Sequence, residues 1–142
     1  MGATSTSVQR SFRLSRSTSD LLDATAELTG ESRNALADRL LGEAVRTERH
    51  PLIRFRTGAA GRREAAVVGT RLLVRQMIAT ARDHDADVGD TASYFGVPPS
   101  VVRAALAYYA DFAHDIDADA ERARRIEADE RARWEREQAA LA

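Results

Sequence analysis

Three polar side chains near the start of the chain have the chemistry to read DNA bases. Gln9, Ser11 and Arg13 alternate with other positions in residues 8–14, and such alternation is typical of a β-strand with two different faces. In the major groove, arginine can pair with guanine O6 and N7, and glutamine can pair with adenine N6 and N7. The other face carries Phe12 and Leu14, so the predicted strand has one polar side and one apolar side.

This strand is predicted to pair with the same strand of a second copy. No strand of matching pattern follows before residue 50, and a lone strand leaves its backbone groups and its apolar side uncovered. A two-fold antiparallel ribbon fits the major groove, with its polar face toward the bases. We therefore expect a homodimer on operator DNA, with a dimer core containing Phe12, Leu14, Leu21, Leu36 and Leu40.

Two helices are predicted to follow the strand and to support it. The first begins after the cap Ser17 and ends at Gly30, and the second begins after the cap Ser32 and runs to about Glu48. The second helix opens on Ser32, Arg33 and Asn34, and its free N–H groups suit a backbone phosphate of DNA. Capping alone is the alternative explanation of Ser32.

The middle of the chain is predicted to form a small hairpin and further helices. Residues 52–69 alternate like a hairpin, Thr70 is placed to cap a helix, and residues 83–89 form a polar loop. Residues 90–115 then have the spacing of a helix-turn-helix, with Gly96 at the turn. Its recognition helix offers few polar side chains beyond Arg103, which favours a structural use of the motif over DNA reading.

Two segments resemble known families. Residues 8–46 resemble the ribbon-helix-helix repressors of the Arc/MetJ/CopG type. Residues 50–115 contain Gly69-Thr70-Arg71-Leu72, Tyr94-Phe95-Gly96-Val97 and Ala105-Leu106-Ala107-Tyr108-Tyr109, and they resemble a small domain typical of VapB-type antitoxins. The resemblance implies that the partner is a PIN-like ribonuclease toxin, which the C-terminal half binds and neutralises, and that the dimer represses its own operon.

The charges are strongly segregated along the chain. Residues 51–82 contain seven arginines and one acid, whereas residues 83–120 contain eight aspartates and one arginine. The basic block consists of Arg54, Arg56, Arg62, Arg63, Arg71 and Arg75. It could follow a second stretch of DNA, face the acidic pocket of a nuclease, or form a solvated face, and the sequence leaves all three open.

The last segment is predicted to be a long charged helix. Residues 118–142, called the tail below, are rich in Ala, Glu and Arg and contain neither Gly nor Pro. The apolar face is too narrow to fold alone. The residues predicted to bind the toxin are Arg125, Ile126, Arg131, Arg133, Trp134 and Leu141. The alternative is that this helix packs back onto its own chain.

Catalysis, metals and cofactors have no supported site in the sequence. The acidic run that begins at Asp83 places Val88 and Tyr94 where a calcium loop needs Gly and Glu. There is no cysteine, no long apolar run and no signal peptide, so we expect a cytoplasmic protein without a membrane segment.

The predicted fold is mainly α. A flexible arm (1–7) precedes a ribbon-helix-helix domain (8–49), a hairpin with helix-turn-helix-like helices (50–117) and the tail (118–142). The predicted function is that of a type II antitoxin and autorepressor. The alternative is a free-standing dimeric transcriptional regulator without a toxin.

Overall fold

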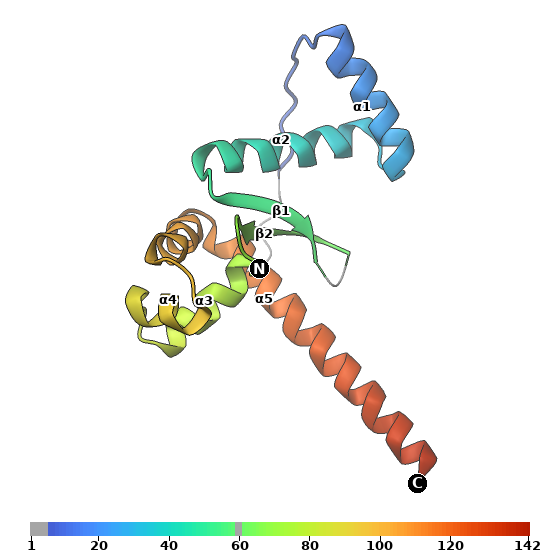
Figure 1. Ribbon diagram of the computed structural model, residues 1–142. Coiled ribbons are helices and arrows are strands. Elements are labelled where there is room, and N and C mark those ends of the chain that lie inside the picture. The colour runs from blue at the N-terminus through green and yellow to red at the C-terminus, as the bar shows by residue number, and fades with distance from the viewer. Residues whose placement is uncertain (1–5, 59–60) are drawn as a thin grey trace. The chain divides into compact units, whose positions relative to one another are not determined.

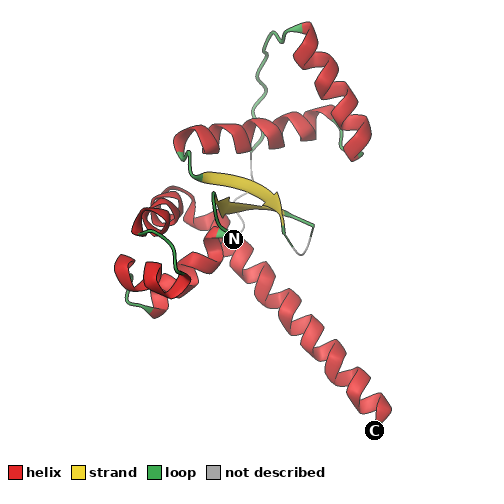
Figure 2. Ribbon diagram, viewed as in Figure 1, coloured by secondary structure: helices red, strands yellow, loops and turns green. Residues whose placement is uncertain are grey.

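The computed structural model is mainly helical, with one two-stranded antiparallel sheet and a long C-terminal helix (Figures 1 and 2), which confirms the coarse fold prediction. It describes residues 6–58 and 61–142, so most of the predicted arm lies outside the described residues. The chain divides into two compact units, Met1–Gly42 and Glu43–Ala142. Each is described by itself.

The first helix of the first unit begins earlier than predicted. Helix α1 spans Arg16–Thr29, and Ser15 is its N-cap, because the Ser15 side chain accepts a hydrogen bond from the Thr18 amide at 3.2 Å. The prediction that Ser17 is the cap was therefore wrong. Ser15 and Ser17 have the same capping chemistry, and local sequence does not choose between them. Gly30 ends the helix with φ of 72°, as predicted for a left-handed cap.

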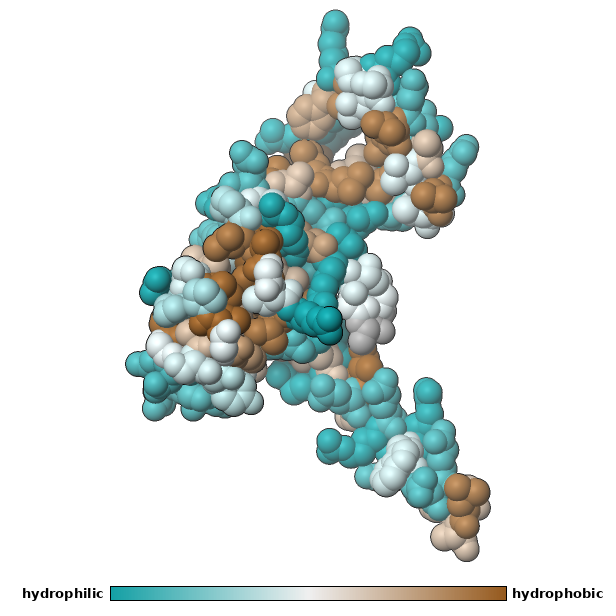
Figure 3. Space-filling model, viewed as in Figure 1, coloured by the Kyte–Doolittle hydropathy of each residue, from teal (hydrophilic) through white to brown (hydrophobic). Residues whose placement is uncertain are grey.

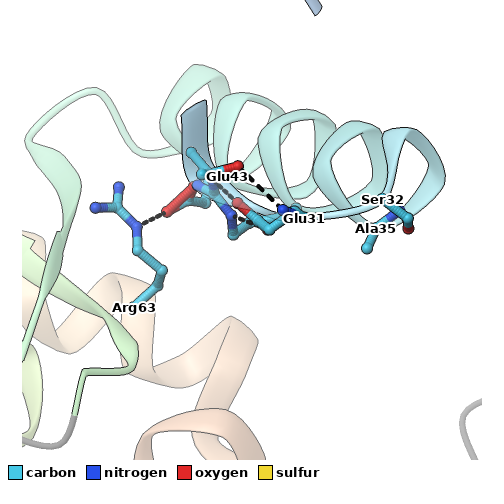
Figure 4. Close-up of polar contacts among 7 residues, drawn as sticks. Glu31, Ser32, Ala35, Glu43 and Arg63 are labelled. Carbon is cyan, nitrogen blue, oxygen red and sulfur yellow. Dashed lines mark hydrogen bonds and ion pairs between the residues drawn. The ribbon is translucent and has the colours of Figure 1, made fainter. Parts of the chain in front are cut away.

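The second helix agrees closely with the prediction. Helix α2 spans Arg33–Arg49, and Ser32 accepts a hydrogen bond from the Ala35 amide at 3.1 Å (Figure 4). The helix begins in the first unit and ends in the second.

Residues 8–14 form no strand in the single chain. They are exposed and lack regular secondary structure, and the described sheet contains only two strands from the second unit. Pairing of this segment between two copies remains a prediction.

The second unit begins with the predicted hairpin. Strand β1 (Ile53–Thr57) pairs with β2 (Arg63–Val67), and Ile53 lies opposite Val67. Alternation along β1 places Ile53 in the core and leaves Arg54 exposed, as expected for a strand with one covered face.

Three helices complete the second unit. They are α3 (Val74–Asp83), α4 (Val88–Phe95) and α5 (Pro99–Leu141). The prediction that Thr70 caps α3 was wrong. The Thr70 hydroxyl instead accepts a hydrogen bond from the Leu72 amide and donates one to the Val67 carbonyl, which stabilises a turn before the helix. The predicted polar loop is shorter than expected, because α4 already begins at Val88.

The core of the second unit lies between the hairpin and the helices. Ile53, Val74, Met77 and Val102 are fully buried, and the Tyr108 side chain lies among them. Helix α5 is continuous in sequence but breaks at Phe112, whose φ of −131° and ψ of 36° are not helical. The break changes the direction of α5 within the unit and precedes the tail.

Candidate nucleic-acid and partner interfaces

The predicted base-reading residues lie on an exposed segment. Gln9, Ser11 and Arg13 are all exposed in the single chain. The alternate positions are exposed as well, at 66% for Phe12 and 54% for Leu14. Both the polar and the apolar side chains of residues 8–14 are therefore accessible to another molecule.

The first unit buries very few apolar side chains. Among its described residues, only Ala26 and Leu36 are buried, whereas Leu21 is 68% exposed and Leu40 is 42% exposed. Of the predicted dimer core, Leu36 alone is buried within one chain. Large apolar side chains exposed at this density are typical of a surface that binds another molecule.

The start of α2 has the geometry of an anion site, with local acids already paired. Ser32 and Asn34 are exposed, and the Arg33 guanidinium contacts the Asp23 carboxylate at 2.6 Å. That ion pair is largely exposed, and exposed pairs contribute little stability, so a phosphate can compete for Arg33. Arg39 holds Glu31 through two hydrogen bonds of 2.7 and 3.0 Å, which reduces the negative charge beside the helix start.

Several arginines of the basic block have partners inside the second unit. Arg63 pairs with Glu43 at 2.7 Å (Figure 4), and Arg75 pairs with Glu64 at 2.7 Å. Arg54 and Arg56 donate to backbone carbonyls. These contacts favour a structural use for much of the block, because a paired guanidinium has fewer donors left for DNA or toxin.

Residues 90–115, predicted as a helix-turn-helix, form α4 and the first part of α5, joined by a short turn at Gly96. Gly96 has φ of 66° at the end of α4, and Ala92 and Val102 are buried at the contact between α4 and α5. Ser100 and Arg103 are exposed on the first turns of α5. The motif thus serves the packing of the unit, while its outer face offers little for base reading.

A cluster at the break in α5 was not predicted from the sequence. His50 Nε2 lies 2.8 Å from the Asp111 carboxylate, and the His50 ring stands edge-on to Tyr108 and Phe112. Arg46 lies over the Phe112 ring at 4.9 Å and contacts Asp115 at 3.3 Å. The end of α2 therefore holds α5 on both sides of its break.

Tyr108 is buried at this cluster. Burial raises the pKa of Tyr108 to about 12, although the nearby Arg46 acts in the opposite direction. The next residue, Tyr109, also precedes the break, but its hydroxyl donates to Asp117 beyond the break at 2.9 Å, and Arg82 lies over the Tyr109 ring. Desolvation and the contact with Asp117 raise the pKa of Tyr109.

One signal for these contacts was present in the sequence. Asp111, Asp115 and Asp119 recur every four residues, so they lie along one side of a helix. Asp111 and Asp115 contact His50 and Arg46 from a different part of the chain, whereas Asp119 pairs with Arg122 of its own helix. Sequence spacing alone does not name such partners. Part of the charge segregation is therefore neutralised inside the second unit.

The predicted toxin-binding residues of the tail differ in how exposed they are. Trp134 is 59% exposed and Leu141 is 84% exposed, whereas Ile126 is half-buried. Arg131 and Arg133 are exposed, and Arg125 lies 3.7 Å from Glu121. A hydrogen bond from Arg124 to Glu121 and the charge of Arg124 lower the pKa of Glu121.

A recess lies between the hairpin and the beginning of the tail. It has a volume of about 200 Å³ and is lined by the hairpin residues Arg62 and Glu64, by Arg75, and by Asp119, Arg122, Ala123, Ile126, Glu127 and Glu130 of α5. Burial raises the pKa of Asp119 at its edge. The tail is thus attached to its own unit only at its beginning.

No protein-family model, no curated protein and no solved structure matches this chain. Within the described ranges 6–58 and 61–142, no helix has the length and apolar character to cross a bilayer, and no group of three His, Asp or Glu side chains is arranged around a common metal position. The exposed surfaces with side chains suited to binding another molecule are those of the first unit and of the tail.

Proposed function

We propose that this chain is a dimeric DNA-binding antitoxin that represses its own operon and neutralises a PIN-like ribonuclease. The observation that carries the DNA-binding part is the exposed apolar side of the first unit. Phe12, Leu14 and Leu21 are each more than half exposed in one chain, next to the alternating residues Gln9, Ser11 and Arg13.

Dimerisation through residues 8–14 would remove this apolar surface from water. Burying one Leu or Phe side chain stabilises a protein by about 1.5–3 kcal/mol, so several such residues from each copy can offset the cost of ordering the segment. Pairing two copies of the segment would also satisfy its free backbone groups. The polar residues would then face outward on a ribbon, with a phosphate held at the start of α2.

The toxin-binding part of the proposal concerns the tail. Its support is the exposure of Trp134 and Leu141, together with the resemblance of residues 50–115 to an antitoxin domain. Trp and Arg are the side chains most enriched at binding hot spots. The tail would bind the ribonuclease while the first unit holds the operator.

Affinity purification of the tagged chain from its native host tests this proposal. Mass spectrometry should find a small nuclease in a stoichiometric amount, and the complex should retain a short promoter fragment from its own operon. A homodimer that retains DNA without a nuclease would refute the antitoxin part and favour a free-standing regulator. A chain that binds no DNA would refute the repressor part.

A further inference from the structure

The exposed side of the tail has a definite chemical pattern. Ala123, Glu127, Glu130, Trp134, Glu137 and Leu141 follow one another at alternating spacings of four and three residues, which places them along one side of the helix. We call this row the Trp134 stripe. Arg125 and Arg136 lie on the opposite side, although both are on the same helix.

The stripe begins in the recess and continues into solvent. Ala123, Glu127 and Glu130 line the recess beside the hairpin, while Trp134 and Leu141 lie further along and are exposed. In Figure 3 the end of the tail shows a hydrophobic group within a mostly hydrophilic surface. A docked segment could therefore follow the stripe from Ala123 to Leu141, about 27 Å at 1.5 Å per residue.

The carboxylates of the stripe are in no ion pair within the described part of the chain, although Arg62 and Arg75 also line the recess. In the part of the chain that the structure describes, Glu127, Glu130 and Glu137 form no salt bridge, whereas Glu121 is held by Arg124 and Arg125. Glu130 lies one helical turn from Trp134. A partner that covers Trp134 would also remove water from Glu130, and a carboxylate that loses water without gaining a cation is costly.

We infer that the Trp134 stripe is a docking surface for a partner segment whose apolar side chains alternate with lysine or arginine. The apolar groups would cover Trp134 and Leu141, and the cations would meet Glu130 and Glu137. This assignment differs from the sequence prediction, in which the tail arginines approach an acidic pocket of the toxin. The identification of the natural partner as a toxin rests on the proposed function. The chemical pattern of the docking surface is independent of the proposed function.

A second copy of the tail is a poor occupant of this surface. Two stripes facing each other in parallel would pair each glutamate with its own copy, and in antiparallel they would bring Glu127 close to Glu137, and such like charges repel. The charge pattern therefore favours a cationic partner over self-association.

A synthetic probe and two matched variants of the full-length chain test the inference. The probe is a labelled peptide of about 18 residues with Leu and Lys at helical spacing, and its control replaces Lys by Glu. The variant E130Q/E137Q removes two charges from the stripe, and D129N/E135Q removes two charges from other sides of the same helix. Because the chain contains a single tryptophan, its emission reports on Trp134 alone.

The Leu/Lys peptide should bind the parent chain and shift Trp134 emission to shorter wavelength. By fluorescence anisotropy, affinity should fall roughly threefold to tenfold in E130Q/E137Q and stay unchanged in D129N/E135Q. In W134A it should fall roughly tenfold or more.

Three results would overturn the inference: equal loss in both double variants, binding without an emission shift, or equal affinity for the Leu/Glu peptide. Self-association of the parent chain that weakens in W134A would instead assign the stripe to a second copy. The peptide assay needs neither operator DNA nor a nuclease, so its failure is distinguishable from failure of the proposed function.

Discussion

At the scale of single residues, Arg13 is the proposed reader of operator sequence. Its side chain is exposed beside Phe12 on the segment that would form the ribbon. In Arg13→Ala, we expect a loss of about 1–3 kcal/mol in binding to the operator, because one bidentate contact to guanine is removed. Titration against operators changed at each base should show that specificity relaxes at one position. A uniform loss across all sequences would make Arg13 a phosphate contact instead.

Tyr108 should make the folded protein sensitive to alkali. Its pKa is raised from the ordinary value of 10.0 to about 12, so between these pH values the folded chain keeps a proton that the unfolded chain has lost. The free energy of unfolding should therefore be unaffected by this group below pH 10 and fall by about 2–3 kcal/mol as the pH rises to 12.

Chemical denaturation at a series of pH values measures this dependence. Tyr108→Phe should remove most of the decrease, because phenylalanine has no proton to lose. Tyr109→Phe is the control on the neighbouring, solvent-accessible ring, and it should leave most of the decrease in place. A decrease that is the same in Tyr108→Phe and the parent chain would rule out Tyr108 as its source.

At the scale of elements, the break in α5 separates two tasks of one helix. Residues before Phe112 pack in the core of the second unit, and the contacts of Arg46 and His50 fix the helix on both sides of the break. The tail beyond them contacts its own unit only near the recess. Removing the tail should therefore leave the core intact.

Deletion of residues 118–142 should separate repression from neutralisation. Operator binding, measured by gel shift, should remain within about threefold of the full chain, because the proposed contacts lie in the first unit. Rescue of growth from the toxin should be lost. Equal loss of both activities would contradict this division of tasks.

At the scale of the whole molecule, the stability of the first unit should depend on protein concentration. Each tenfold rise in concentration adds about 1.4 kcal/mol to the stability of a dimer that unfolds to separate chains. Circular dichroism should show a melting temperature that rises with concentration and falls in Phe12→Ala. Leu52→Ala, at an exposed position of the second unit, is the control that should keep this dependence. A concentration-independent melting temperature would contradict the dimer.

Toxin binding should also strengthen operator binding. If one toxin assembly joins two antitoxin dimers on neighbouring sites, the second dimer binds at a high effective concentration, which predicts a gain of roughly tenfold or more. Gel shifts with and without saturating toxin measure the gain. An operator affinity that is unchanged by saturating toxin would contradict this coupling.

Elements whose causes are local could be predicted from the amino-acid sequence. The caps Gly30 and Ser32, the hairpin alternation around Ile53, the turn at Gly96 and the long tail helix were all predictable, because each depends on a few neighbouring side chains. Helix starts were less certain: Ser15 replaced Ser17 as a cap, and Thr70 was used in a turn. In both places several nearby residues have equivalent chemistry.

Contacts between side chains far apart in the sequence became known only from the packing of the elements. The contacts of Arg46 and His50 with Asp115 and Asp111, and the break at Phe112 that they surround, join residues more than 60 positions apart. The partners of the basic block were likewise not predictable from spacing: Arg63 pairs with Glu43, and Arg75 pairs with Glu64, inside the second unit. Sequence spacing shows which residues share a face of one element, but the partner of that face depends on how the elements pack.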